Sequence, residues 1–304
     1  DQDLIFAIDD WRLDAEMQMD TKSLGSMHDW SHAGRLGNVI TVNGKTDQSY
    51  PVATGERIRL RLLNIANART MNLLFNEPEL SVIAVDGQPV KPFTPETGRV
   101  RLAPGQRVDL IVDMTADPGE RRLIEVVIGE YAYEVAGFNY DPIPKREQML
   151  NTPIALPQNP LQLTSLPDEF MQVPLRMEGG AMGGMRGAIF EGREMGIREL
   201  IQNRKVWAIN GIVGLPEKPL FSVRRGTAIS LDVINDNSWP HAMHIHGHHF
   251  IYHKTPEFWR DTALFARGER GTMKFVADNP GRWLIHCHMV EHMAGGMVTW
   301  FEVT

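Results

Sequence analysis

Two segments near the C-terminus decide the fold: HAMHIHGHHF, residues 241–250, and HCHMVEHMAGGM, residues 286–297. The chain has 304 residues and 11 histidines, and all of these except His28 and His32 lie between positions 241 and 292. The single cysteine, Cys287, stands between two histidines. Such a concentration of metal-binding side chains indicates that this part of the chain binds metal.

The spacing within these segments predicts two separate binding faces. Side chains alternate between the two faces of an extended strand, so His244 and His246 point to one side together. For the same reason His286 and His288 share a side, while Cys287 points to the other. One face therefore offers four imidazoles, and the opposite face offers a thiol that is their covalent neighbour.

On the cysteine face, three more side chains can join Cys287. His292 and Met297 follow it by five and ten positions, and His241 can reach it from the neighbouring strand. Two imidazoles, a thiolate and a distant thioether are the ligands of a blue-copper electron-transfer site. Zinc also binds Cys and His, but structural zinc sites are closed tetrahedral sets without methionine. The pattern favours copper.

The pair HxxHxHGHxF and HCHxxxHxxxxM resembles the third and fourth copper motifs of the multicopper oxidases, the family of laccases and bacterial copper oxidases. By this resemblance the type 1 copper ligands are His241, Cys287, His292 and Met297. The type 2 ligand is His244, and the type 3 ligands are His246, His286 and His288. His248 and His249 match no ligand position of the family.

Composition sets outer bounds on partners and location. The chain carries 31 basic and 38 acidic residues, a net charge of −7, which argues against nucleic acid as a partner. No apolar run approaches the roughly 18 residues of a membrane span, and one cysteine allows no internal disulfide. The sequence begins at Asp1 with no signal peptide, so we expect a processed or truncated chain. A periplasmic or otherwise exported location is implied only by the family resemblance.

Short alternating or apolar runs separated by turn signals extend from Leu4 to about Asp141 and resume near residue 200. This pattern predicts β-sandwiches or Greek-key barrels. Residues 142–174 carry seven prolines, a density that no sheet interior tolerates. We therefore predict an all-β protein with two cupredoxin-like Greek-key domains, 1–141 and 200–304, joined by a Pro-rich linker and Gly/Met-rich segment over 142–199.

The two halves look like repeats of each other. Asn43-Gly44 matches Asn210-Gly211, and Gly55 matches Gly226. Projected onto the first half, the ligand positions fall on residues that bind no copper: Thr70, Leu73, Phe75 and Glu125. The first half resembles the ligand-free middle domain of three-domain members, and the second half resembles the third domain. The N-terminal domain, which in the family supplies the other two HxH pairs, would then be missing.

The resemblance implies an oxidase that takes electrons from a small reduced donor at type 1 copper. Electrons would pass through Cys287 and its neighbours His286 and His288 to a trinuclear copper centre that reduces O2 to water. We expect this activity only with an N-terminal cupredoxin domain, on the same gene product or a separate chain. The alternative is a non-enzymatic blue-copper electron-transfer or copper-binding module. A copper nitrite reductase would not pair HCH with HxHGH, and a purely structural β-sandwich would not need Cys287.

Two further features concern the donor and proton supply. Met297 as axial ligand resembles bacterial members of moderate potential, so Cu(I) or a diphenol-like molecule is the expected donor. Thioethers suit Cu(I), which makes a candidate Cu(I) site of Met177, Met182 and Met185; alternatively, these methionines fill gaps in apolar packing. Met293 occupies the position where some members carry an acidic residue for proton delivery, and Glu291 lies on the other side of His292.

Overall fold

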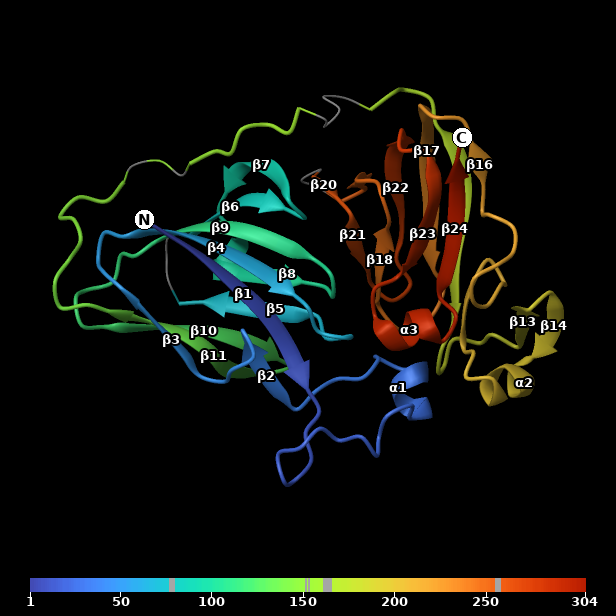
Figure 1. Ribbon diagram of the computed structural model, residues 1–304, viewed down its shortest axis with the longest axis horizontal. Helices are drawn as coiled ribbons and strands as arrows, with labels where there is room; N and C mark the ends of the chain where they lie inside the picture. The colour runs from blue at the N-terminus through green and yellow to red at the C-terminus, as the bar shows by residue number, and fades with distance from the viewer. Residues whose placement is uncertain (77–79, 151, 153, 161–165, 255–257) are drawn as a thin grey trace. The chain divides into compact units, whose positions relative to one another are not determined.

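The computed structural model describes residues 1–304 except 77–79, 151, 153, 161–165 and 255–257 (Figure 1). It divides into two compact units. Unit 1 comprises Asp1–Met19, Gly37–Ala66 and Thr70–Pro160; unit 2 comprises Asp20–Leu36, Asn67–Arg69 and Leu161–Thr304. Both units are built from packed sheets, so the predicted all-β class is confirmed. Among the described helices, none is long and apolar enough to cross a membrane.

Unit 1 consists of a six-stranded sheet, β2-β1-β4-β9-β6-β7, and a five-stranded sheet, β3-β11-β10-β5-β8. The first sheet contains β1 (Gln2–Trp11), β2 (Val39–Val42), β4 (Arg57–Asn64), β6 (Leu80–Val85), β7 (Gln88–Phe93) and β9 (Arg107–Asp113). The second contains β3 (Gln48–Val52), β5 (Met71–Phe75), β8 (Arg99–Leu102), β10 (Arg121–Ile128) and β11 (Tyr131–Tyr140), with a short 3-10 turn at Glu96–Gly98.

Strand β4 shows how the sequence specifies this unit. Its residues alternate between apolar side chains and arginines, as a strand with one face on the core requires. Three of the apolar members are fully buried, namely Ile58, Leu60 and Leu62. The arginines form ion pairs: Arg57 with Asp113, Arg59 with Asp109, and Arg61 with Asp3. A shift of one residue would exchange the two sets, so the register is strongly determined.

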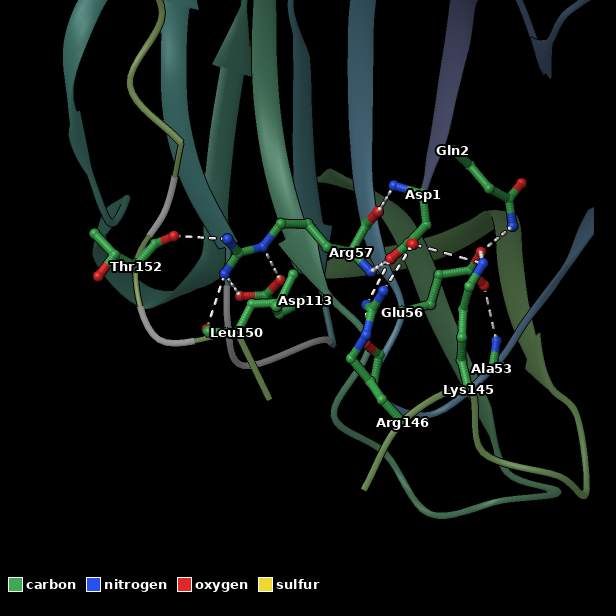
Figure 2. A network of polar contacts seen from close by, with 11 residues as sticks. Asp1, Gln2, Ala53, Glu56, Arg57, Asp113, Lys145, Arg146, Leu150 and Thr152 are labelled. Atoms are coloured by element: carbon green, nitrogen blue, oxygen red, sulfur yellow. Dashed lines mark hydrogen bonds and ion pairs between the residues drawn. The ribbon is translucent and has the colours of Figure 1, made fainter. Parts of the chain in front are cut away.

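The Pro-rich segment begins as part of unit 1. Figure 2 shows Arg57 at the centre of a polar network, with Nη1 donating to the carbonyl of Thr152 at 2.6 Å and Nη2 to that of Leu150 at 2.9 Å. Arg146 donates to both carboxylate oxygens of Asp1, at 2.6 and 2.8 Å. These contacts fasten the described residues between 142 and 152 to unit 1, where the sequence had predicted a Pro-rich linker between the domains.

Unit 2 repeats the same layout with sheets β15-β12-β17-β22-β19-β20 and β16-β24-β23-β18-β21, and a small hairpin β13-β14. The first sheet contains β12 (Met171–Gly179), β15 (Trp207–Ile209), β17 (Thr227–Asn235), β19 (Phe250–Tyr252), β20 (Trp259–Arg260) and β22 (Arg270–Ala277). The second contains β16 (Ser222–Val223), β18 (His241–Ile245), β21 (Thr262–Phe265), β23 (Gly281–Cys287) and β24 (Val298–Val303). The hairpin strands are Gly187–Phe190 and Arg193–Gly196, followed by helix α2 (Ile197–Gln202).

Strand β12 differs from the predicted linker over 142–199, because its residues Met171–Met177 pair with β17. Its side chains at Val173, Leu175 and Met177 are buried in the core of unit 2. On its other edge β15 covers only Met177–Gly179, so Pro174 lies on an unpaired stretch where its missing N–H costs no ladder hydrogen bond. The number of prolines alone could not show that this part of β12 has an unpaired edge.

Two short pieces of the N-terminal half belong to unit 2, which the predicted boundary at residue 141 did not anticipate. Residues 20–36 contain helix α1 (Met27–Ser31), which lies beside helix α3 (Val290–Ala294) (Figure 1). Ala68, from the second piece, is part of the core of unit 2. Unit 2 is therefore assembled from three separate stretches of sequence.

The Arg57–Asp113 pair predicts a large effect on the stability of unit 1. Its side chains are 7% and 12% exposed, so Arg57→Met leaves a buried carboxylate and two carbonyls without a donor. We expect a loss of about 3–5 kcal/mol in the free energy of unfolding, measured by urea denaturation. Arg61→Met is the matched control: its pair with Asp3 is 38% and 47% exposed, so the loss should stay within about 1 kcal/mol. Equal losses would contradict this assignment.

Candidate metal centre

The centre is built on the pairing of β18 with β23. The two strands are antiparallel, with His244 opposite His286 and Met243 opposite Cys287. Directly opposed side chains project from the same face of a sheet, so the histidine pair and the cysteine lie on opposite faces. Helix α3 follows β23 and carries His292, and β24 then returns beside β23.

On one face, His241, Cys287 and His292 form a group that we call the cysteine cluster. One potential ligand atom from each lies within 4.8 Å of the others, and all three residues are fully buried. The Nδ1 atoms of His241 and His292 are 3.0 Å apart, and Cys287 Sγ is 3.7 Å from His292 Nδ1. Two imidazole nitrogens and one sulfur thus converge on one point, a donor set that fits copper.

Hydrogen bonds on the outer nitrogens fix how these imidazoles are protonated. His241 Nε2 lies 3.0 Å from Asn237 Oδ1, and His292 Nε2 lies 2.7 Å from the backbone carbonyl of His32. Both partners are oxygens that accept, so each Nε2 carries the proton and donates it. The lone pair on each Nδ1 is then left facing the cluster, as a metal ligand requires.

Burial keeps the metal-free cluster uncharged. It raises the pKa of the Cys287 thiol to about 12 and lowers the pKa of His292 to about 4. The pKa of His241 is also lowered well below its usual value, by burial and then by the neighbouring His292. Because metal ligands must be deprotonated, copper binding would displace the thiol proton and meet imidazoles that are already neutral.

Met297 lies next to this cluster through its main chain. The backbone N–H of Cys287 donates to the carbonyl of Met297 at 3.1 Å, and the N–H of Met297 donates to the carbonyl of His292 at 2.9 Å. The Met297 side chain is fully buried in the core of unit 2. Its position is compatible with an axial ligand beside the three closer donors.

On the other face, His244, His246 and His286 form a second group, the histidine cluster, with ligand atoms within 4.8 Å of one another. The Nε2 atoms of His246 and His286 are 2.9 Å apart. His244 Nδ1 donates to the carbonyl of Asp261 at 2.8 Å, and His286 Nδ1 donates to the carbonyl of Cys287 at 2.9 Å. These two bonds leave Nε2 of both rings for metal. Burial, with smaller effects from the neighbouring imidazoles, lowers the pKa of His286 to about 4.

His288 lies at the margin of the histidine cluster. Its ring centre is 5.7 Å from that of His244 and 5.9 Å from that of His286, outside the close group of three. His248, which matched no ligand position, is buried against Phe275, Trp283 and Phe301. The predicted ligands thus divide between the cysteine cluster and the histidine cluster, on opposite faces of the β18–β23 pair. His288 lies farther out than the three members of the histidine cluster.

The described contacts do not bring the three candidate Cu(I) methionines together. Met177 is buried in the main core of unit 2, whereas Met185 packs against a separate small cluster around the β13-β14 hairpin. Met182 is 77% exposed. Apolar packing accounts for the positions of Met177 and Met185. A Cu(I) site at the three methionines stays a prediction.

Several residues around the two clusters were not identified from the sequence, and Glu291 was noted there only for its position beside His292. Asn237 stands four positions before His241, and this closeness in sequence could have suggested it as a hydrogen-bond partner. The carbonyl of His32 carries no side-chain signal and lies 260 positions from His292. Glu291 is buried, and its Oε2 accepts the backbone N–H of Arg35 at 3.1 Å. Trp207 packs against both imidazoles of the cysteine cluster, 4.4 Å from His292 and 4.9 Å from His241.

Comparison with known proteins identifies the family. Family models described as multicopper oxidase match residues 2–124 and 193–304. This chain belongs to the multicopper oxidase family, and copper is its metal. The chain is 25% identical to multicopper oxidase mco of Staphylococcus haemolyticus, over 89% of this chain and 53% of that protein. It spans about half the length of the curated relatives it matches.

Two solved structures are similar along the whole chain. Lac15 from a marine microbial metagenome is 31% identical, with a TM-score of 0.71, and the match covers 100% of this chain and 66% of that one. A multi-copper oxidase from Pseudomonas thermotolerans superposes with a TM-score of 0.81 at 23% identity, covering 100% of this chain and 68% of that one. The latter similarity supports the fold.

The lowered histidine pKa values predict how the copper-free protein responds to acid. Unfolded imidazoles protonate near pH 6.5, whereas His286 and His292 in the folded chain do so at about 4. Their contribution to stability is therefore complete above about pH 6.5 and is lost as the pH falls toward 4. We expect the urea midpoint of the metal-free chain to drop across this window, and to drop less in His292→Gln. The same pH dependence in both proteins would count against the buried, neutral imidazole.

Proposed function

We propose that the cysteine cluster, with Met297, is the type 1 copper site of a multicopper oxidase, and that the histidine cluster is part of its trinuclear site. The observation that carries this proposal is the double role of Cys287. Its sulfur belongs to one cluster, and its carbonyl accepts the Nδ1–H of His286 in the other. When bound, copper would supply the one-electron chemistry that couples oxidation of a donor to reduction of O2 to water.

The residues of the chain would prepare the type 1 site for electron transfer by holding its ligands still. His241, Cys287, His292 and Met297 are all fully buried, so water does not reorganise around them. The outer nitrogens of both imidazoles are held by oxygen acceptors. Ligands held in this way change little in position when the charge of the centre changes, which is what rapid electron transfer needs.

The histidine cluster would be only one side of the trinuclear site. His244, His246, His286 and the nearby His288 come from unit 2, and β5 and β10 of unit 1 carry buried apolar residues in the equivalent place, Leu73 opposite Val126. We infer that a further cupredoxin domain, on the same gene product or on another chain, supplies the remaining ligands. The oxidase would be active only in that assembly.

The donor and the location are further parts of the proposal. Met297 as the axial ligand supports a small reduced donor such as Cu(I) or a diphenol-like molecule. An exported, periplasmic location agrees with copper chemistry kept outside the cytoplasm. A second function, non-enzymatic electron transfer or copper holding, is supported by the cysteine cluster, whose three close donors all come from unit 2.

Copper reconstitution of the 304-residue chain tests the proposal. We expect about one tightly bound copper per chain and the intense visible band of a thiolate-bound blue copper. Cys287→Ser should abolish the band, because it removes the sulfur ligand. Met182→Leu, a change at an exposed thioether, is the control and should leave the band unchanged.

Oxygen consumption separates the two functions. About one copper per chain and no O2 consumption, with O2 consumption restored in a complete three-domain assembly, would support the oxidase. No O2 consumption in that assembly would favour the electron-transfer module. A chain without the visible band would overturn the type 1 assignment altogether.

A further inference from the structure

The residues Asp20–Leu36, which we call the cap, cover one edge of the cysteine cluster. The cap is part of unit 2 although it lies far from the other residues of that unit in sequence. The carbonyl of His32, in the cap, accepts the Nε2–H of His292 at 2.7 Å. His292 is fully buried in this arrangement, so the edge of the ring that faces away from the cluster meets the cap instead of water.

Arg35 gives the cap a fixed internal shape. Its guanidinium donates to Ser23 Oγ and to the carbonyl of Asp20, each at 2.6 Å, and lies 3.5 Å from the buried Asp29 carboxylate. One side chain thus ties the beginning of the cap to its end, as in a compact surface loop whose ends are close together. The two ends of the cap are therefore held together by contacts within the cap itself.

The cap is fastened to the rest of unit 2 beside the cluster. Trp207 Nε1 donates to the carbonyl of Trp30 at 2.6 Å, and the N–H of Ala181 donates to the carbonyl of Ser31 at 2.7 Å. Gly34 has a φ of +82°, and a Cβ there would stand 2.4 Å from the Cβ of Ala68. The close approach at Gly34 is needed for the cap to seat fully.

Glu291 holds the cap close to the contact between His32 and His292. Its Oε2 accepts the N–H of Arg35 at 3.1 Å, and Glu291 directly precedes His292 in α3. Two neighbouring residues of α3 therefore contact the same stretch of the cap. Glu291 contacts Arg35, and His292 contacts His32. The acceptor in this contact is an acidic side chain, and hydrogen bonds to charged groups are the stronger class.

We propose that Glu291 is a positioning residue that holds the cap closed over His292, so that an electron donor meets the outer face of the cap and not the imidazole of His292. This inference rests on the proposed type 1 site. On that outer side His28 is exposed and stacks on His32 at 4.1 Å, and His32 lies 5.1 Å from Trp239. The cap would thereby exclude donors from direct contact with the metal ligands.

Cys287 reports on the cap without any metal, because it is the only thiol in the chain. In the metal-free protein we would measure its rate of reaction with a bulky aromatic disulfide reagent. Loss of the Glu291 hydrogen bond should raise this rate by about ten- to a hundredfold in Glu291→Ala, because the cap opens more often. Glu291→Gln should restore the slow rate, since its amide oxygen can accept the same N–H. Glu199→Ala, at an exposed glutamate, is the matched control.

The urea transition of each variant shows whether it folds. If Glu291→Ala does not fold, Ser23→Ala provides a milder opening of the cap by removing one acceptor of Arg35. Equal thiol reactivity in wild type, the alanine variant and Ser23→Ala would overturn the inference, as would a fast rate in Glu291→Gln. The copper band of the wild type is recorded separately, so failure of the type 1 assignment would be distinguished from failure of the cap.

Discussion

The hydrogen bond from His292 Nε2 to the carbonyl of His32 is the contact on which the closed cysteine cluster depends. A buried imidazole N–H without an acceptor is costly, and a metal ligand needs its other nitrogen unprotonated. One carbonyl oxygen meets both requirements and also keeps water from the ring. Asn237, in unit 2, has the same part for His241: its side-chain oxygen accepts the Nε2–H of that ring. The orientation of the two imidazoles thus follows from where two oxygen atoms are placed.

The pairing of β18 with β23 is the second constraint on the two clusters. Comparison with the equivalent strand pair of unit 1 shows what this pairing determines. The strand orders β2-β1-β4-β9-β6-β7 and β15-β12-β17-β22-β19-β20 correspond position by position, and so do those of the two five-stranded sheets. The strands equivalent to β18 and β23 in unit 1 are β5 and β10, where Leu73 lies opposite Val126 and both are fully buried. The same framework therefore supports either an apolar core or metal ligands, according to the side chains it carries.

The sequence alone predicted the features that depend on local alternation. The all-β fold and the division of Cys287 from its histidine neighbours follow from a period of two along a strand, and the repeat follows from turn residues that recur in both halves. The cap and strand β12 were not predicted, because each depends on partners far away in sequence. His32 contributes a backbone oxygen that any residue would carry, and Pro174 is tolerated only because β15 stops short of it. The proline-rich composition concealed a core strand that buries Met177.

The sequence separation within the cap contacts has a consequence for the order of assembly. The cap leaves the ribosome before any of unit 2's strands exist, and its partners on α3 follow about 260 residues later. Closing so long a loop costs conformational entropy before any contact repays it. During synthesis, the cap must therefore wait without its partners until nearly the whole chain has emerged. Enclosure of His292 is thus a late step, possible only when the first and the last parts of unit 2 are both present.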